Sequence, residues 1–330
     1  MPNIFGNFNH RKPWNSDFSR KATEADVVSC FRLLLGRKPG EQEWGGHVWK
    51  IGEELGSVVS SYLNSQEFAK RRLLDTGVSQ WQLVSMPTFK MYASLEDKSI
   101  GQTIIYKREY ERPVTRMFKK YLRPGMGVLD LGANIGYFSL LAASLVGPTG
   151  FVQSWEPAPG NVRALCASRA VNGLDHIEVV QAAAAEKNGL LQYFRNSING
   201  SVGGVEHTDP DDLFTAETVM GLRVDDFISP DAKVGFIKID VEGYEFRALQ
   251  GARKTIERCR PIVVSEFGPP SLQDCSGVSG REYLEFFVGL GYDVLSMTRL
   301  RMKPGSVDEI ISRFEESGRD HIDVVLLPRT

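Results

Sequence analysis

From residue 128 onward, short apolar segments alternate with longer helical ones, and this alternation constrains the fold more than any other feature of the chain. Strands are expected at Val128–Leu131, Phe151–Trp155, Ile177–Gln181, Phe236–Ile239, Ile262–Glu266, Tyr292–Leu295 and Asp323–Leu327. Helices are expected at Ile135–Leu145, Asn161–Val171, Tyr244–Ile256 and Arg281–Leu290. This order predicts an α/β fold of the Rossmann-like class, with a mainly parallel seven-stranded sheet and helices on both faces. Ligands of such sheets bind beyond the carboxyl ends of the strands.

The residues before this alternation divide into an expected tail, a helical module and the start of the larger domain. Residues 1–20 lack the apolar segment of a secretory signal and are expected to be extended or disordered. Residues 21–78 are expected to form four helices. Thr23 and Asp26 cap the first, and Ser65 caps the fourth with Phe68 turned inward. The second carries Trp44, Val48 and Ile51, and the third carries Val58, Val59, Tyr62 and Leu63. The larger domain, 79–330, begins with strand-like pairs at Thr88–Tyr92 and Thr103–Tyr106 and a helix at Pro113–Leu122.

Composition excludes several classes of protein. The 330 residues carry a formal net charge of −2, and the clusters at 70–72 and 119–120 are too short to predict a nucleic-acid-binding stripe. No run approaches the ~20 apolar residues of a membrane span. The four cysteines lack metal-ligand spacing, which indicates reduced thiols in a cytoplasmic protein. A homo-oligomer stays possible.

The loop at Asp130–Gly136 follows the first strand of the alternation and opens a helix. Gly132 permits a tight turn, Asn134 tolerates a left-handed backbone, and Gly136 lets the helix pack closely. Asp130 stands two residues before the first glycine, where it would repel a pyrophosphate and attract the amino and sulfonium groups of S-adenosylmethionine (SAM). The spacing also departs from the dinucleotide fingerprint, and no P-loop lysine follows. The loop therefore predicts a SAM site that includes Ala133.

The next two strand ends extend the predicted cofactor site. Glu156, followed by Pro157, ends the second strand at a distance from the glycine loop that suits a bidentate contact with ribose hydroxyls. The alanine run at 182–185, with Ala183 near its centre, would suit a flat adenine. An alanine run is equally compatible with a helix or a packed core segment.

Charged residues crowd the junction of strand and helix at 238–245. Lys238 and Asp240 share a face of the strand, and Glu242 and Glu245 lie where a helix dipole favours negative charge. Crowded carboxylates raise one another's pKa, as in general bases. Glu266 ends the following strand. Lys238, Asp240 and Glu242 are therefore candidate catalytic residues, and Asp240 is also expected at the cofactor. Asp240, Glu242 and Glu266 are candidates for positioning a substrate hydroxyl or for binding a divalent cation.

Together these segments resemble the FkbM family of methyltransferases over about residues 105–300. The matching residues are 128–136, 155–157 with Asn161, 224–226, 238–245, 251–252 and 261–266. The resemblance implies a class I methyltransferase fold, SAM as cofactor, and O-methylation of a sugar, glycolipid or natural product. It implies that Asp130, Gly132, Asn134, Gly136 and Glu156 contact SAM, and that Asp240 and Glu242 belong to the active site. His207, in a loop outside the match, is a further candidate base.

Three alternatives remain. An RNA 2′-O-methyltransferase would also place a Lys/Asp/Glu set near SAM, although the acidic composition disfavours it. A non-catalytic glycan- or protein-binding chain with a relic Rossmann domain would explain the helical module. Residues 31–37 and 65–68 of that module resemble a unit found in bacterial cell-surface and glycan-related proteins, although a plain helical cap fits equally. A nicotinamide enzyme is disfavoured by the glycine spacing.

Overall fold

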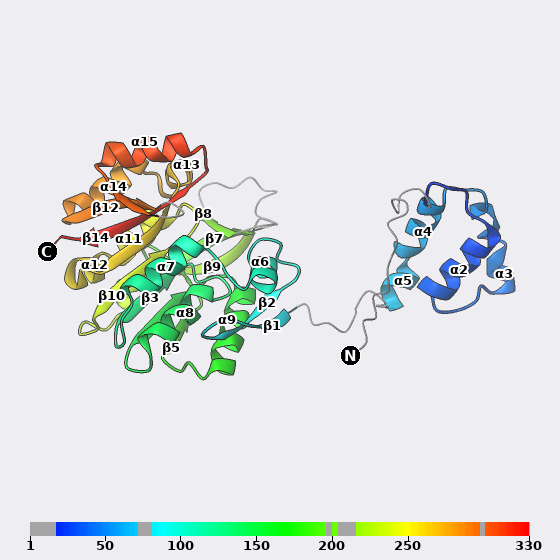
Figure 1. The fold of residues 1–330 in the computed structure, drawn as a ribbon, viewed down its shortest axis with the longest axis horizontal. Helices are drawn as coiled ribbons and strands as arrows, with labels where there is room; N and C mark the ends of the chain where they lie inside the picture. The colour runs from blue at the N-terminus through cyan, green and yellow to red at the C-terminus, as the bar shows by residue number, and fades with distance from the viewer. Residues whose placement is uncertain (1–17, 72–80, 196–199, 204–215, 298–300, 330) are drawn as a thin grey trace. The chain divides into compact units, whose positions relative to one another are not determined.

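A computed structural model describes residues 18–71, 81–195, 200–203, 216–297 and 301–329 of the chain (Figure 1). The chain divides into two compact units, Met1–Ser79 and Gln80–Thr330, and each is described by itself. Most of the expected N-terminal tail lies outside the described residues. No helix among the described residues has both the length and the apolar character needed to cross a membrane.

The first unit is a small bundle built around α2 (Glu24–Leu34) and α4 (Leu55–Leu63). The capping box between Thr23 and Asp26 is confirmed, and so is the contact of Ser65 Oγ with the backbone N–H of Phe68 at the start of α5 (Gln66–Arg71). The prediction of one continuous second helix is wrong. It is divided into α3 (Glu41–Trp44) and a 3₁₀ turn, η1 (Val48–Lys50), because two consecutive glycines follow Trp44 and weaken a helix.

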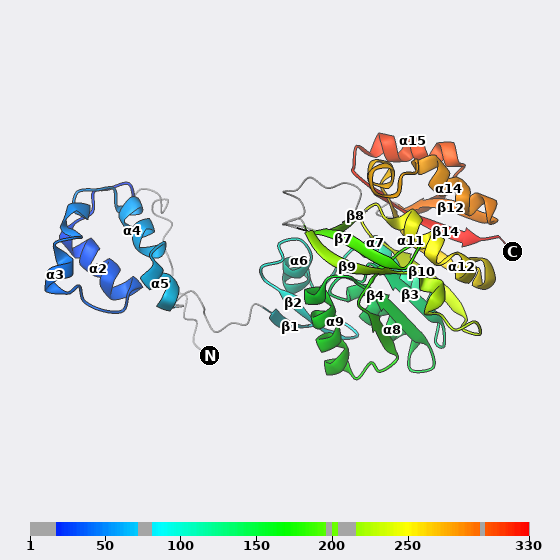
Figure 2. The same cartoon turned by 180° about the vertical axis from the view of Figure 1, so that it is seen from behind.

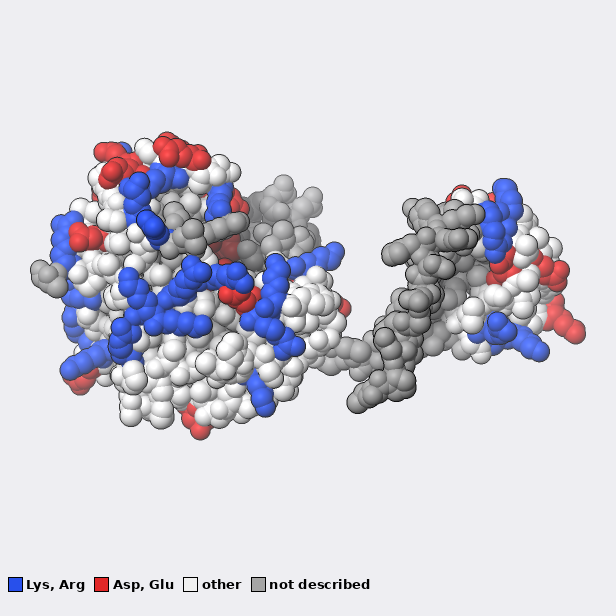
Figure 3. All heavy atoms as spheres, viewed as in Figure 1, with Lys and Arg blue, Asp and Glu red and all other residues white. Residues whose placement is uncertain are grey.

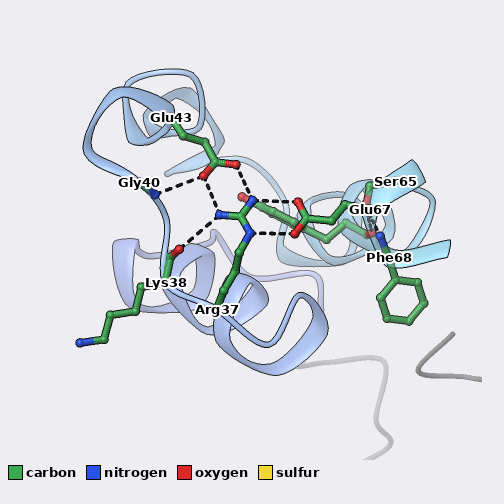
Figure 4. A network of polar contacts seen from close by, with 8 residues as sticks. Arg37, Lys38, Gly40, Glu43, Ser65, Glu67 and Phe68 are labelled. Carbon is green, nitrogen blue, oxygen red and sulfur yellow. Dashed lines mark hydrogen bonds and ion pairs between the residues drawn. The ribbon is translucent and has the colours of Figure 1, made fainter. Parts of the chain in front are cut away.

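The guanidinium of Arg37 holds this bundle together at its polar side (Figure 4). It donates two hydrogen bonds of 2.7 Å to the carboxylate of Glu43 and two of 2.7 Å to that of Glu67. The pKa of the Glu43 carboxyl falls to about 2, chiefly because of the hydrogen bonds from Arg37. One planar fork therefore ties α3 and α5 to the segment that follows α2.

The second unit is organised around an eight-stranded sheet of order β13-β12-β14-β11-β10-β3-β4-β5. Its strands are β3 (Gly127–Leu131), β4 (Phe151–Trp155), β5 (Ile177–Val180), β10 (Val234–Ile239), β11 (Ile262–Phe267), β12 (Tyr292–Met297), β13 (Met302–Pro304) and β14 (Ile322–Pro328). Only β14 and β13 run against the other six strands. The sheet is therefore mainly parallel. It has one strand more than expected, because the short β13 folds back onto β12.

Helices cover both faces of this sheet (Figures 1 and 2). They are α6 (Ile100–Lys107), α7 (Arg112–Tyr121), α8 (Tyr137–Val146), α9 (Pro159–Asn172), α11 (Glu245–Gly251), α12 (Arg253–Cys259), α13 (Pro269–Ser271), α14 (Gly280–Gly289) and α15 (Val307–Ser317), with 3₁₀ turn η2 (Val224–Asp226) and π-helix η3 (Leu272–Ser276). Successive side chains along a strand point to opposite faces of the sheet, so they pack against different layers of helices. Val128 packs in the core with α7 and α8, whereas Leu129 packs in the core with α11, α12 and α14.

Two features outside the alternation differ from the expectation. Residues 103–106 belong to helix α6 rather than to a strand, because Ile100 and Ile104 are buried one turn apart and Thr103 Oγ1 donates to the carbonyl of Ser99. Four described segments after β5 build a second sheet of order β6-β9-β7-β8, with β6 (Ala183–Ala184), β7 (Gly189–Arg195), β8 (Gly200–Gly203) and β9 (Ala216–Leu222). A hairpin of β1 (Trp81–Ser85) and β2 (Lys90–Ser94) opens the unit.

Candidate active site

A cavity opens at the carboxyl ends of β3 and β10, which are neighbours in the sheet. The chain leaves β3 toward β4 and β5 on one side and later returns on the other side as β10. The point between these two strands is where an open α/β sheet leaves a crevice for ligands. The cavity is lined by Ile100, Tyr110, Glu111, residues 132–135, Tyr137, Phe138, residues 155–157, Asn161, residues 182–184, Tyr193, Lys238, Asp240, Val241, Glu242, Tyr244, Glu266 and His321.

The glycine loop owes its shape to the approach of the neighbouring strand. Gly132 has a φ of 83°, and a Cβ there would lie 1.9 Å from the backbone oxygen of Asp240. Asn134 is left-handed, with a φ of 49°, as its residue type indicated. Gly136 is also left-handed, and a Cβ on it would meet Leu165 of α9 at 2.3 Å. Gly132 and Asn134 therefore form the cavity wall, whereas Gly136 serves close packing behind it.

Replacing Gly132 by alanine tests this close approach. We expect Gly132→Ala to lower the free energy of unfolding by about 1–3 kcal/mol more than Gly173→Ala, because only the first introduces a clash with backbone atoms. Gly173 is a matched control, since its φ is 62° and nothing lies within 4 Å of a Cβ built there. Urea unfolding followed by circular dichroism measures both variants. Equal losses in the free energy of unfolding would show that the left-handed backbone, and not the close approach of Asp240, requires glycine at position 132.

Glu156 joins the loops that follow β3 and β4. Its Oε2 accepts from the backbone N–H of Asn134 at 2.9 Å, and its Oε1 accepts from the N–H of Ala158 at 2.9 Å and from Asn161 Nδ2 at 3.2 Å. The side chain is buried, and burial raises its pKa against the effect of these donors. Each carboxylate oxygen offers two lone pairs. One acceptor position on Oε2 is therefore left for a further donor, and the bidentate contact with ribose stays a prediction.

A polar row crosses the sheet beneath the cavity. Lys238 of β10 pairs in register with Asp130 of β3, which pairs with Ser154 of β4. Asp130 Oδ2 accepts from Ser139 Oγ at 2.6 Å, while Oδ1 has no hydrogen-bond partner among the described residues and lies 3.9 Å from Lys238 Nζ. The Asp130 side chain is fully buried and does not line the cavity, contrary to the expected direct contact with a ligand. Strand pleating directs it toward α8 instead.

Lys238 links this row to the cavity. Its ammonium lies 3.1 Å from Asp240 Oδ2 and donates to the carbonyl of Gly132 at 3.2 Å. Burial by itself would lower the pKa of Lys238, but the carboxylates of Asp240, Asp130 and Glu111 raise it above its ordinary value. The lysine therefore stays charged and holds the ends of β3 and β10 together.

Three carboxyl groups meet at the predicted position. One oxygen each of Asp240, Glu242 and Glu266 lies within 4.8 Å of the other two. Burial and the neighbouring Asp240 raise the pKa of Glu266 to about 11, so Glu266 holds a proton that it shares in a hydrogen bond with Asp240. Burial would raise the pKa of Asp240, but Lys238 keeps it below its ordinary value. Burial and Asp240 raise the pKa of Glu242 to about 7. The site thus pairs an ionised with a protonated carboxyl group.

Glu245 does not join this cluster of cavity-lining acids. Its Oε1 accepts from the backbone N–H of Val241 at 2.9 Å and of Gly243 at 3.2 Å. The side chain is buried beneath the turn. It therefore stabilises the start of α11, which is the capping role that its position indicated.

Two cavity residues, Glu111 and His321, and a neighbouring carboxyl group, Asp323, had not been predicted. Glu111 precedes α7 with a left-handed φ of 35°, and burial together with Asp240 raises its pKa to about 7. Asp323 pairs in register with Glu266, and burial and Glu111 raise its pKa to about 7 as well. His321 lines the cavity just before β14. Because β14 is antiparallel, its first residues lie where the parallel strands end.

These raised pKa values predict how stability depends on pH. The folded state holds protons on Glu111 that the unfolded chain releases, so Glu111 contributes stability below about pH 4.5, and this contribution is lost as the pH rises to about 7. We expect the unfolding free energy to fall over this range, and Glu111→Gln to make the fall shallower by up to about 1.4 kcal/mol per pH unit. Urea unfolding at a series of pH values measures the slope. Glu316→Gln, on the exposed side of α15, is the control and should leave the slope unchanged. A wild-type slope of the opposite sign would contradict the assignment.

The structure brings most of the predicted residues together. Those that line the cavity are Gly132, Ala133, Asn134, Glu156, Pro157, Ala183, Lys238, Asp240, Glu242 and Glu266. Asp130 and Gly136 lie behind its wall. His207 lies outside the described residues.

Comparison with known proteins agrees with this geometry. The sequence profile of the family described as Methyltransferase FkbM domain matches residues 130–294, which is half of the chain. This chain belongs to the FkbM methyltransferase family. The second unit has the Rossmann-like fold of class I methyltransferases, with the antiparallel β14 between β11 and β12.

Individual relatives of this FkbM chain are distant. The FkbM methyltransferase of Methylobacillus flagellatus is 17% identical, with 64% of this chain and 50% of that chain covered and a TM-score of 0.39. A SAM-dependent O-methyltransferase of Thermotoga maritima is 11% identical, with 66% and 64% covered and a TM-score of 0.35. A wheat (Triticum aestivum) protein-L-isoaspartate O-methyltransferase is 35% identical over 77 residues, which are 23% of this chain and 30% of the wheat protein. The chain thus spans half or less of the first and third of these relatives.

Proposed function

We propose that this chain transfers a methyl group from SAM to a hydroxyl group of a sugar, glycolipid or natural-product acceptor. The observation that carries the proposal is the group of carboxyl side chains at one end of the cavity, beside the glycine loop. A hydroxyl must lose its proton as it attacks a methyl carbon. Carboxyl groups with pKa values near neutrality are suited to accept that proton.

A second set of lining residues fits the cofactor. It comprises the loop 132–134, whose backbone N–H groups already donate to Trp155 and Glu156, the available acceptor position of Glu156, and the small side chains of 182–184. The acidic lining attracts a sulfonium and an amino group and repels a pyrophosphate. This selection comes from Asp240, Glu242 and Glu111, since Asp130 lies behind the wall and faces Lys238. SAM, when bound, supplies the electrophilic methyl group.

The carboxyl cluster would orient the acceptor and take its proton. Asp240 is ionised and held by Lys238 and Glu266, so it can accept a hydrogen bond from a hydroxyl group. Glu242, with a pKa of about 7, can then receive the proton when it is ionised. Positioning two groups in this manner supplies much of the rate of a transfer reaction.

The same three oxygens also fit a divalent cation. Asp240, Glu242 and Glu266 offer the hard oxygen ligands that Mg²⁺ and Ca²⁺ prefer. Binding would require Glu266 to lose the proton that it shares with Asp240. A cation is therefore an alternative way in which the cluster would hold the acceptor hydroxyl.

The decisive experiment measures binding and transfer separately on the full chain. Calorimetry with SAM tests the cofactor, and transfer of a radiolabelled methyl group to cell-envelope glycans and small glycosides, with and without EDTA, tests the acceptor and the cation. We expect stoichiometric SAM binding and a labelled, alkali-stable ether product. Absence of SAM binding would refute the cofactor assignment. Binding without transfer to any hydroxyl acceptor would refute the acceptor class.

A further inference from the structure

The turn between β10 and α11 carries Glu242 in a backbone conformation that glutamate rarely adopts. Glu242 has a φ of 55°, and Gly243 follows it with a φ of 95°. A left-handed residue other than glycine costs free energy and persists only where the surrounding structure holds it in place. The side chain at this position lines the cavity, so a change in the backbone would move one of the three carboxyl groups. The contacts that hold this turn therefore determine part of the cavity.

One contact comes from the helix that the turn begins. On the face drawn in Figure 3, Asp and Glu side chains gather at the end that carries α15. Glu245 of α11 is buried instead, and it accepts hydrogen bonds from the backbone N–H groups of Val241 and Gly243. These two residues flank Glu242. Glu245 therefore fixes the turn relative to α11, but this contact does not tie the turn to the strand that carries Glu266.

A second contact ties the turn to the segment that follows β11, the strand that carries Glu266. Ser276 Oγ donates a hydrogen bond of 2.6 Å to the carbonyl of Gly243, 33 residues earlier in the chain, and Ser276 is 7% exposed. Ser271 packs against the same glycine, since a Cβ on Gly243 would lie 2.5 Å from the backbone oxygen of Ser271. Ser271 ends α13 and Ser276 ends η3. A π-helix such as η3 is rare and frequently occurs at a functional site.

The serines of ordinary helices in this unit bond differently. Ser144 and Ser168 each donate to a carbonyl of their own helix. Ser276 instead donates to the turn of another element, and this buried hydrogen bond joins the turn of Glu242 to the segment behind Glu266. The relative position of these two carboxyl groups therefore depends on it.

We infer that Ser276 is a positioning residue, whose hydrogen bond to Gly243 keeps the carboxyl group of Glu242 where it receives the proton of the acceptor. Ser276 does not line the cavity, so it acts through the turn and not on a ligand. A displacement of about 1 Å in a reacting group can lower a rate about 10²-fold. The cofactor residues 132–134 follow a different strand, β3, so SAM binding should not depend on Ser276. The inference rests on the proposed function.

Steady-state rates of methyl transfer by the full chain test this role. We expect Ser276→Ala to lower kcat about 10-fold to 10²-fold and to leave the KM for SAM unchanged. Ser276→Cys keeps the size of the side chain but donates only weakly, so it should lose rate as well and separates the hydrogen bond from packing. Ser168→Ala is the matched control. It removes a buried hydroxyl that donates to the carbonyl of Ala164 at 2.7 Å, outside the cavity, and should keep the wild-type kcat.

A double variant tests whether Ser276 acts through Glu242. In the Glu242→Gln background, Ser276→Ala should lower kcat no further, because the group that Ser276 positions has already lost its carboxylate. A further loss of the same size would assign Ser276 to the stability of the fold as a whole and would overturn the inference.

Hydrogen exchange on the same variants needs no acceptor. The backbone N–H groups of Val241 and Gly243 should exchange about fivefold faster in Ser276→Ala, because one lost hydrogen bond weakens the turn, and at the wild-type rate in Ser168→Ala. Unchanged exchange in Ser276→Ala would overturn the inference, and so would faster exchange with an unchanged kcat. A wild-type chain that binds SAM but methylates no hydroxyl acceptor would refute the proposed function instead, while the exchange rates would still test whether Ser276 holds the turn.

Discussion

Asp240→Asn is expected to lower the rate of methyl transfer by about 10²-fold, the scale for misplacing a reacting group, because Asp240 orients the acceptor hydroxyl. Asparagine keeps the size of the side chain but removes the charge that pairs with Lys238 and accepts hydrogen bonds in the cavity. The shared proton of Glu266 also loses its ionised partner. The rate is measured with an acceptor found in the glycoside screen.

Two further measurements make this result specific. SAM affinity, determined by calorimetry on the same preparation, separates slower transfer from weaker cofactor binding. Asp231→Asn removes a carboxylate at an exposed position before β10 and should leave the rate unchanged. Turnover by Asp240→Asn at the wild-type rate would refute a role for Asp240 in methyl transfer. Glu242 and Glu111 would then be the candidates for that role.

Lys238→Met is expected to lower the free energy of unfolding by about 3–5 kcal/mol, because it leaves buried carboxylates without their counter-charge. Asp130 is fully buried, and Asp240 pairs with the same ammonium. Glu111 is also attracted electrostatically to Lys238. Without Lys238 the already raised pKa of Asp130 rises further, and the pKa of Asp240 rises from its lowered value, so the folded state binds more protons than it does in the wild type. The deficit should therefore grow as the pH rises from acid to neutral.

Two companion variants test the cause of this loss. Lys254→Met, at an exposed position of α12, should change stability by less than about 0.5 kcal/mol. Adding Asp130→Asn to Lys238→Met removes one uncompensated charge and should restore part of the loss. Urea unfolding at several pH values measures all three variants. A deficit independent of pH would indicate lost packing against Phe138, whose ring lies 5.4 Å from the ammonium, rather than lost charge pairing.

Local sequence patterns determined the order of strands and helices in the larger domain and most of the cavity wall. Strand periodicity places Val128 and Leu129 on opposite faces, and a parallel sheet brings the ends of β3, β4, β10 and β11 to one edge. Asn134 and Gly132 were readable because a left-handed backbone selects few residue types. Glu156 and Asp240 were readable because they stand directly after apolar strands.

Only the tertiary structure decided which side chains share the cavity and in which state of protonation. Asp130 was placed at the ligand from its position in the chain, but the pleat of β3 turns it toward Ser139 and Lys238. His321 lines the cavity and Asp323 lies beside Glu266 because β14 runs antiparallel, a property of the assembled sheet. Glu111 joins the cavity from a turn before the alternation begins. Distances between residues far apart in the sequence set these charges and pKa values, and no local pattern encodes such distances.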